Sequence, residues 1–304
     1  MLAARRKSAA RADLERRMVW MLASPRSGTT WMLNLLGGRP EVVKVDEPGI
    51  GTHLGVFLHQ ANGAPASVMS REQSLVSQAR AGQPDYFFSA AAADVWRPAL
   101  RELLLTRFEA QLAADGRRDA LCVIKEPNGA QAAGMLFDTL PASRLLWMLR
   151  DGRDVVDSEL DAVASGAWGA FERWEMSAED RLRFVEDRAH IWLRRAEIIE
   201  DAYAGLPVAQ RLIVRYEEAR ATPAAELKRV LDWLGVEADM AACERDAEAL
   251  SFERVPAEQR GAGKFTRSAT PGVWRQNLSD AEQAVLERVM GEQLRELGYD
   301  SSSR

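Results

Sequence analysis

The sequence predicts an α/β fold of three layers, in which a mostly parallel central sheet is covered by helices on both faces. Short apolar runs that end at turn residues alternate along the chain with longer segments of helical periodicity. Strands that alternate with helices favour parallel pairing, because each helix returns the chain to the same edge of the sheet. Hydrophobic residues make up 47% of the 304 residues, so the chain can bury a sizeable core.

Five apolar runs are predicted to form the strands of this sheet. The first run, MVWMLA, ends at Ser24-Pro25, which is a turn signal typical of the end of a buried strand. The runs LCVIK, RLLWMLR and RLIVRY have the same character, and a short strand is expected after Glu41. The predicted strands are residues 18–23, 42–45, 121–125, 144–150 and 211–216.

The helices are predicted from the spacing of apolar residues and from capping residues. Ser177, followed by Asp180, is close to a capping box, and Thr222 before Pro223 has the pattern of an N-cap and first turn. Asp94 is expected to cap the helix that begins there. The predicted helices are residues 29–36, 94–114, 177–204, 222–235 and 279–297.

The chain is expected to form one domain, residues 18–304, after a basic tail at 1–17 that is solvated or helical, or that contacts a membrane surface or a partner. Residues from about 49 to 94 show no clear period and are expected to be a functional insertion.

No apolar run suits a membrane-spanning helix or a signal peptide. Cys122 and Cys243 are too few for a disulfide framework, so a reduced, cytoplasmic setting is the expectation. The formal net charge of −5 argues against a protein that binds nucleic acid through its phosphates.

The turn after the first predicted strand has the composition of an anion-binding loop. Pro25-Arg26-Ser27-Gly28-Thr29-Thr30-Trp31 places a glycine and three hydroxyl residues between a strand and a helix. Backbone N–H groups at a helix N-terminus favour an anion, and a glycine lets a phosphate approach closely. The loop is not a Walker A motif, since no G-x-x-x-x-G-K-[ST] pattern is present.

This loop resembles the 5′-phosphosulfate loop of sulfotransferases that use 3′-phosphoadenosine 5′-phosphosulfate (PAPS). In that family the loop has the pattern P-[KR]-S-G-T-T-W, and every position matches at residues 25–31. The resemblance implies a P-loop NTPase-like sulfotransferase fold. It also implies that the nucleotide is bound by Arg26, Ser27, Gly28, Thr29, Thr30 and Trp31. Trp31 would stack on the adenine, although a tryptophan packed beneath the loop is an alternative.

A second segment resembles the family's binding element for the 3′-phosphate. In the family, an arginine that ends a strand and a serine eight residues later hold this phosphate, and Arg150 and Ser158 have that spacing. A guanidinium suits bidentate contact with a phosphate, and a hydroxyl can donate one further hydrogen bond. Tyr216 resembles the tyrosine of the family's Y-E-x-L element beside the nucleotide, and a core tyrosine is the alternative.

A third segment, residues 267–275, resembles the family's R-x-G-x-x-G-x-W-K pattern and implies a 3′-phosphate contact for Arg267. It departs from the pattern at Ala269 and Arg275, which replace a glycine and a lysine. The basic stretch at 260–264 could share the role of Arg267, and a plain polar loop is the alternative.

The implied reaction is in-line transfer of a sulfuryl group from PAPS to a hydroxyl or amine, with 3′-phosphoadenosine 5′-phosphate (PAP) as product. Sulfuryl transfer, like phosphoryl transfer, is expected to pass through a loose transition state. An enzyme stabilises such a state mainly by positioning the reactants and by placing charge near the transferring group. Arg26 and Lys125 are expected to stabilise the transferring group without a metal ion, although Lys125 could instead reach solvent. The acceptor could be a small molecule, a peptide or a glycan. A hydrophobic or aromatic acceptor is favoured by the residues of the predicted insertion, which include Phe57, Leu58, Tyr86, Phe87 and Phe88.

The identity of the general base is the most open of the expected roles. In the cytosolic small-molecule members a histidine two residues after the lysine is the base, and here that position is Pro127. The motifs are closer to the protein-tyrosine and bacterial branch, where the loop and a helix are followed by H-P-E-V and then by a glutamate base. Glu47, which lies 21 residues after Arg26, has that place. The alternatives are Asp46, Glu126 and His53.

Two other function classes compete with a sulfotransferase. A P-loop kinase or NTPase acting on ATP predicts a Walker lysine and an acidic Mg²⁺ site, and it leaves Arg150 and Ser158 unexplained. A catalytically silent scaffold would keep the nucleotide-binding loop, but Arg26, Lys125 and Glu47 argue against it. The sequence does not indicate an oligomeric state.

Overall fold

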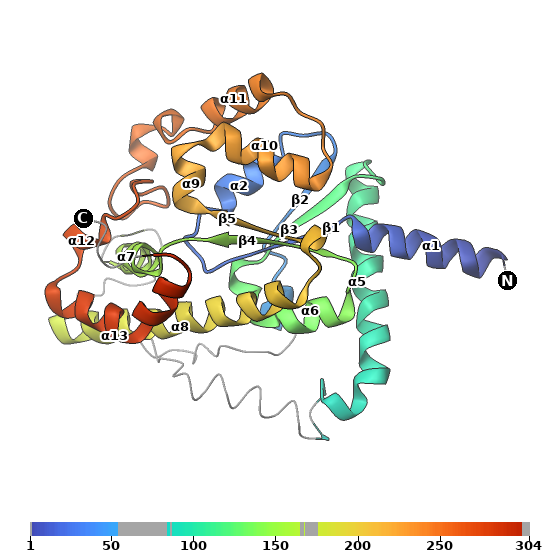
Figure 1. Ribbon diagram of the computed structural model, residues 1–304, viewed down its shortest axis with the longest axis horizontal. Coiled ribbons are helices and arrows are strands. Elements are labelled where there is room, and N and C mark those ends of the chain that lie inside the picture. Colours follow the sequence, from blue (N-terminus) through green and yellow to red (C-terminus); the bar gives the residue numbers. More distant parts are fainter. Residues whose placement is uncertain (1, 54–83, 86, 165–166, 168–175, 300–304) are drawn as a thin grey trace.

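The computed structural model describes residues 2–53, 84–85, 87–164, 167 and 176–299 and has the predicted α/β architecture (Figure 1). Most of the predicted insertion at 49–94 lies outside these residues, and Phe57, Leu58 and Tyr86 lie there as well. No helix within the described ranges is long and apolar enough to cross a membrane.

One sheet of five strands forms the centre of the fold. In spatial order the strands are β2 (Val42–Asp46), β3 (Leu121–Lys125), β1 (Met18–Leu22), β4 (Arg144–Leu149) and β5 (Arg211–Arg215). Every pair of neighbours is parallel, which confirms the prediction of a mostly parallel sheet. Each strand lies where it was predicted, with its end shifted by one residue at most. Because β1 lies in the middle, the residues that follow it are flanked by the ends of β3 and β4.

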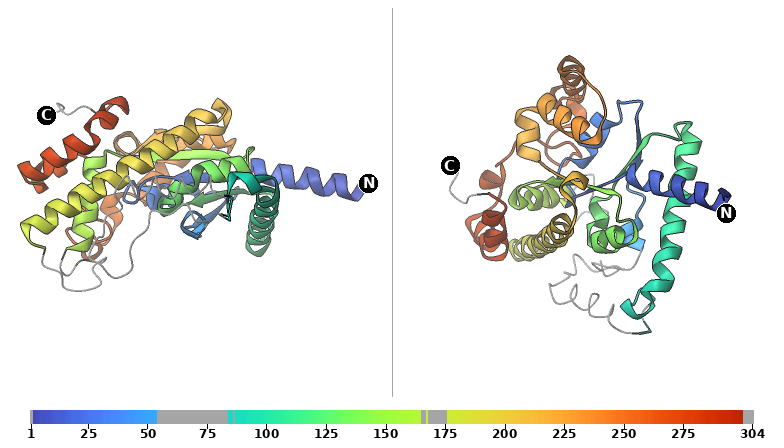
Figure 2. Two further views of the ribbon diagram at one scale, coloured as in Figure 1. Left: turned by 90° about the horizontal axis from the view of Figure 1, so that it is seen from below. Right: turned by 45° about the vertical axis from the view of Figure 1, so that its right-hand side comes forward.

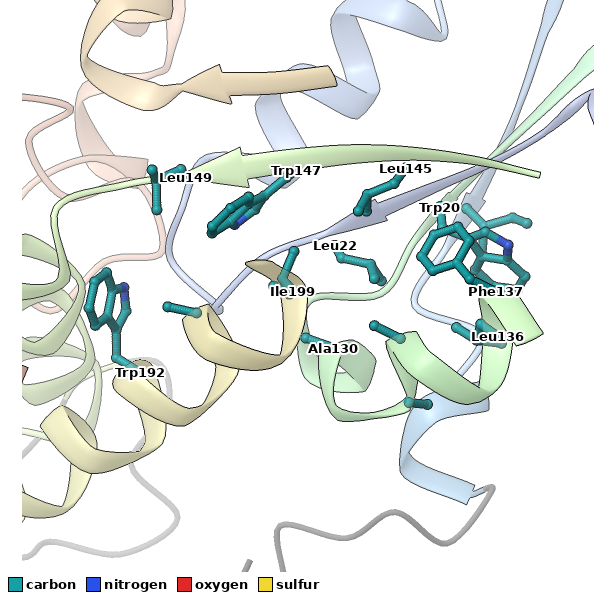
Figure 3. Close-up of a cluster of buried hydrophobic side chains, with 14 of the residues drawn as sticks. Trp20, Leu22, Ala130, Leu136, Phe137, Leu145, Trp147, Leu149, Trp192 and Ile199 are labelled. Atoms are coloured by element: carbon teal, nitrogen blue, oxygen red, sulfur yellow. The ribbon is translucent and has the colours of Figure 1, made fainter. Parts of the chain in front are cut away.

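Side chains that alternate along β1 contribute to two separate cores. Trp20 and Leu22 belong to the larger core, which packs against α6 (Ala133–Thr139) and α8 (Ala178–Gly205) (Figure 3). The ring of Trp20 contacts the ring of Phe108 edge to face, with 5.8 Å between their centroids.

The second core lies on the opposite face of the sheet. Val19 and Met21 pack there against α2 (Thr29–Leu36) and α10 (Pro223–Leu234) (Figure 1). All five residues of β1 are buried, as a strand covered on both faces requires. The sheet and its two helical layers therefore form the predicted three-layer sandwich.

The other helices complete these layers. They are α1 (Leu2–Arg16), α3 (Ile50–His53), α5 (Ala93–Asp115), α7 (Gly152–Val163), α9 (Tyr216–Ala221), α11 (Met240–Ala249), α12 (Trp274–Asn277) and α13 (Asp280–Glu296). Helices α7, α8 and α13 pack side by side (Figure 2). Ser177 and Ser279 form capping boxes at the starts of α8 and α13, and the first of these confirms the pattern seen in the sequence.

One predicted cap is wrong, and another is confirmed in position but makes no side-chain capping bond. Asp94 lies in the first turn of α5, whose N-cap is Ala92, because a 3₁₀ turn at Ala90–Ala92 leads directly into the helix. Thr222 does occupy the N-cap position of α10, but its hydroxyl donates to the carbonyl of Glu218 in the preceding helix instead of capping. Neither helix has a side-chain hydrogen bond at its N-cap, because each continues from a turn or helix immediately before it.

The basic segment before β1 is helical, and its second half packs against α5. Leu14 is 4% exposed and belongs to the larger core. Arg11 donates hydrogen bonds to Glu109 Oε2 at 3.0 Å and to Thr106 Oγ1 at 2.8 Å. The N-terminal end of α1 projects from the body of the molecule (Figure 2).

Candidate functional site

The carboxyl ends of the parallel strands bring the predicted residues to one edge of the sheet. The loop at 25–31 follows the central strand β1. Lys125 ends β3 on one side of this loop, and Arg150 follows β4 on the other. Tyr216 comes directly after β5, so four strands contribute to one site.

Gly28 gives the loop its shape. Its φ is +81°, in the left-handed region, and it occupies the N-cap position of α2 without any side-chain cap. A Cβ at this position would lie 2.5 Å from Cδ2 of Tyr216. A residue with a side chain would therefore collide with that ring. The N-cap of α2 also offers no side-chain acceptor to the first backbone N–H groups of the helix, so these groups can bind an anion.

Arg26, Arg150 and Ser158 are in direct contact. Arg26 donates through Nε to Ser158 Oγ at 3.0 Å, and Arg150 donates through Nη1 to the carbonyl of Arg26 at 2.7 Å. Arg150 also lies over the ring of Tyr216, 4.4 Å from its centroid. Burial, and then the nearby guanidinium of Arg150, lower the pKa of Arg26 below its ordinary value.

Lys125 connects the loop with the predicted base. Its Nζ donates to Thr30 Oγ1 at 2.8 Å and forms ion pairs with Asp46 at 2.6 Å and Glu47 at 3.0 Å. Its side chain is only 3% exposed, so it does not reach into solvent. Glu47 is 43% exposed, and its other oxygen accepts a hydrogen bond from Asn128 Nδ2 at 3.1 Å.

The alternative bases occupy different positions. Glu126 is 1% exposed, and its carboxylate accepts a hydrogen bond from the backbone N–H of Ile50 at 2.9 Å, which anchors α3. Asp46 contacts Lys125 from the side of β2. The side chain of His53 lies outside the described part of the chain.

A cavity of about 740 Å³ lies beside the loop at 25–31, and Lys125, Asp46 and Glu126 are not among the described residues that line it. Most of the predicted nucleotide residues line it, while Ser27 is buried. Among the described residues its wall carries one carboxylate, that of Glu47, and five guanidinium groups. The arginines are Arg26, Arg150, Arg220, Arg254 and Arg267. Such an excess of positive charge suits a ligand with several negative charges.

The C-terminal loop forms another wall of the cavity. Arg267 lies in this wall and pairs with Asp157 at 2.7 Å. Ala269 has a φ of +52°, the left-handed backbone that a glycine at this place in the family pattern favours. Arg260 instead donates to the carbonyl of Phe252 and lies over its ring.

Several residues that line the cavity were not predicted from the sequence, and Arg220 is the most informative of them. It lies over the ring of Trp31, 5.6 Å from the centroid, and Trp31 Nε1 donates to the carbonyl of Leu250 at 3.0 Å. Arg220 follows Tyr216 by one helical turn on α9, and this spacing could have indicated it. Leu250 and Phe265 come from loop segments that carry no comparable signal.

The chain resembles known proteins in sequence and in fold. A model of the "Sulfotransferase family" matches residues 19–240. The fold is similar to that of mouse sulfotransferase SULT7A1 complexed with PAP, with a TM-score of 0.55, 11% identity, and coverage of 91% of this chain and 84% of that one. It is also similar to sulfotransferase STF9 from Mycobacterium avium, with a TM-score of 0.53, 14% identity, and coverage of 95% and 78%.

A third similar structure is retinol dehydratase in a complex with retinol and PAP, with a TM-score of 0.53, 16% identity, and coverage of 95% and 83%. At these identities the structural similarity shows the fold. A search of curated sequences found no significant match. The family match covers most of the chain, including the loop at 25–31 and the ends of all five strands. The chain therefore belongs to the sulfotransferase family.

Proposed function

We propose that this protein transfers a sulfuryl group from PAPS to a hydroxyl or amine of an acceptor. The observation that carries the proposal is that five arginines and one carboxylate line the cavity among the described residues. Two of these arginines, Arg254 and Arg267, also pair with carboxylates outside the lining, those of Glu248 and Asp157. PAPS bears a phosphosulfate and a 3′-phosphate, and guanidinium groups bind such oxyanions well. A volume of about 740 Å³ lies in the range of known ligand pockets.

The residues around the loop fit the two anionic ends of this nucleotide. The amides at the start of α2, with Gly28 and Arg26, suit the 5′-phosphosulfate. Arg150, Ser158 and Arg267 suit the 3′-phosphate, since all three line the same cavity. Trp31, in the wall beside Arg220, offers a ring on which the adenine can stack.

PAPS supplies the activated sulfuryl group, and the protein supplies charge at the atoms that react. During transfer the bond between sulfur and the bridging phosphate oxygen breaks, a bond to the acceptor oxygen or nitrogen forms, and PAP leaves. Arg26 and Lys125 are the cations at the loop, and they stabilise the charge that develops on the leaving and transferring oxygens.

Glu47 is the proposed general base, because it is the carboxylate of the cavity wall among the described residues. One of its oxygens is held by Lys125 and the other by Asn128, so the group is fixed at the edge of the cavity. It would accept the proton that the acceptor hydroxyl or amine loses as the new bond forms.

The proposal is tested by measuring transfer of labelled sulfuryl from PAPS to a panel of phenols, aliphatic alcohols and amines. Glu47→Gln is expected to lower kcat by about 100-fold or more, the usual effect of losing a general base. PAP affinity is expected to stay within about twofold, because Glu47 contacts Lys125 and Asn128 and none of the residues assigned to the phosphates.

Glu41→Gln is the matched control, since Glu41 is exposed and lies at the far end of β2 from the site. This variant should transfer at the wild-type rate. Full activity of Glu47→Gln would refute the assignment of the base. Absence of transfer to every acceptor by the wild-type protein, together with absence of PAP binding, would refute the proposed function.

A further inference from the structure

Helix α7 carries a row of three aspartates that contact the C-terminal loop of the cavity. Asp154, Asp157 and Asp161 are spaced by three and four residues, so they share one face of the helix. All three accept hydrogen bonds or form ion pairs with residues between 263 and 277. The loop that closes one wall of the cavity is therefore attached to the helix that supplies Ser158.

The outer two aspartates hold the backbone of this loop. Asp154 accepts hydrogen bonds from the N–H groups of Gly272 at 2.7 Å and Trp274 at 3.3 Å. Asp161 accepts one from the N–H of Gly263 at 2.9 Å. These contacts fix both ends of the loop, because buried backbone donors must find an acceptor.

The middle aspartate holds a side chain of the cavity. Asp157 is 3% exposed, and it accepts from Nη1 of Arg267 at 2.7 Å and from Nη2 at 3.2 Å. Asn277 donates to the same carboxylate at 3.0 Å. The Asp157 carboxylate and the Arg267 guanidinium thus form a bidentate pair, and the hydrogen bond from Asn277 also holds the carboxylate in place.

This pair leaves Arg267 able to bind an anion. Asp157 uses one N–H of each terminal nitrogen, and Nε lies 3.7 Å from Oδ1 of Asp161, so the second N–H of each terminal nitrogen is still available as a donor. Without Asp157, Arg267 would keep only the long ion pair of its Nε with Asp161, at 3.7 Å, as a partly buried cation in a wall that already carries four other arginines. Repulsion and desolvation would then favour its departure from the wall.

We propose that Asp157 is a positioning residue that holds Arg267 in the cavity wall and thereby sets the preference for a nucleotide with a 3′-phosphate. This inference rests on the proposed function, in which Arg267 contacts that phosphate. Ser158, the next residue on α7, lines the same cavity, so one turn of this helix both binds the 3′-phosphate and orients its arginine.

The test compares calorimetric titrations with PAP and with adenosine 5′-phosphate, which lacks the 3′-phosphate. The wild-type protein is expected to prefer PAP. In Asp157→Asn the affinity for PAP should fall about tenfold or more, while affinity for adenosine 5′-phosphate stays within about twofold. Asp201→Asn, at an exposed position on α8, is the control and should change neither affinity.

A double-mutant cycle establishes whether Asp157 acts through Arg267. Arg267→Gln alone should reduce the preference for PAP, and adding Asp157→Asn to it should reduce the preference no further. If Asp157→Asn does not fold, Asp157→Ser and Arg267→Gln are compared by the same quantity, the ratio of the affinity for PAP to the affinity for adenosine 5′-phosphate. An unchanged ratio in Arg267→Gln would overturn the inference.

Three other results would also overturn the inference. Equal loss of affinity for both nucleotides in Asp157→Asn would show a general structural role. Tighter PAP binding in that variant would show that Asp157 competes with the phosphate for Arg267. An unchanged ratio in Asp157→Asn, with clear PAP preference in the wild type, would refute the positioning role alone. Absence of PAP binding in the wild type would instead refute the proposed function.

Discussion

Replacing Gly28 by alanine tests how the loop and the nucleotide site depend on each other. Gly28 has a φ of +81°, and a Cβ there would lie 2.5 Å from Cδ2 and 2.8 Å from Cε2 of Tyr216. The Tyr216 ring would have to move, and this ring supports the guanidinium of Arg150 at 4.4 Å. The variant is therefore expected to lose stability and nucleotide affinity together.

The size of the stability loss follows from two contributions. A left-handed backbone costs a residue with a side chain about 1–2 kcal/mol. Insertion of a methyl group into a packed contact costs about 1–3 kcal/mol more. Gly28→Ala should therefore lower the free energy of unfolding by about 2–5 kcal/mol, measured by urea denaturation. Displacement of Arg150 should weaken PAP binding about tenfold or more, measured by calorimetry.

Two other glycines separate these contributions. Gly116 also has a φ of +81°, but a Cβ added there would have no atom within 4 Å, so Gly116→Ala should show the backbone cost alone. Gly134 lies inside α6 with equally open space, and its replacement by alanine should be neutral or stabilising by up to about 1 kcal/mol. Equal losses in Gly28→Ala and Gly116→Ala, with wild-type PAP affinity in both, would refute the reasoning.

Three further outcomes are expected. Leu14→Ala should lower the free energy of unfolding by about 2–5 kcal/mol, because Leu14 is buried in the larger core, and a change below about 1 kcal/mol in urea denaturation would contradict this packing. Trp31→Leu should weaken PAP binding by about five- to 150-fold in calorimetry through loss of stacking on the base, whereas wild-type affinity would place the adenine elsewhere. Burial raises the pKa of Asp187 to about 6, so the stability that its protonated form contributes at low pH is lost as the pH rises through that value. We expect the difference in melting temperature, Asp187→Asn minus wild type, to be larger at about pH 7.5 than at about pH 4. The same difference at both pH values would contradict the raised pKa.

The sheet could be predicted because each strand is a short apolar run that is buried on both faces. β1 and β3 are entirely buried, and their boundaries follow directly from the turn residues and charges beside them. The caps of α5 and α10 were harder, because they depend on how the preceding turn enters the helix. That geometry is set by tertiary packing and is not encoded by the capping residue alone.

The part of the site that lies at the carboxyl ends of the strands could be predicted from the sequence. Lys125 ends β3, Arg150 and Tyr216 directly follow β4 and β5, and Arg26 lies four residues after the end of β1. Parallel pairing alone brings them to one edge of the sheet. The partners of these residues could not be predicted in the same way. Arg267 and Asp157 are separated by 110 residues, and their contact depends on the path of an irregular loop. The roles of the individual side chains in binding and catalysis stay predictions.

The arginine-rich cavity is proposed to bind a nucleotide with a 3′-phosphate. The first measurement to make is calorimetric titration with PAP, with ATP plus Mg²⁺ as the comparison. PAP is expected to bind without a metal ion and at least about tenfold more tightly than Mg²⁺–ATP. Preference for Mg²⁺–ATP would refute the proposed nucleotide and favour a kinase or NTPase. Binding of neither nucleotide would contradict it as well and favour a catalytically silent scaffold.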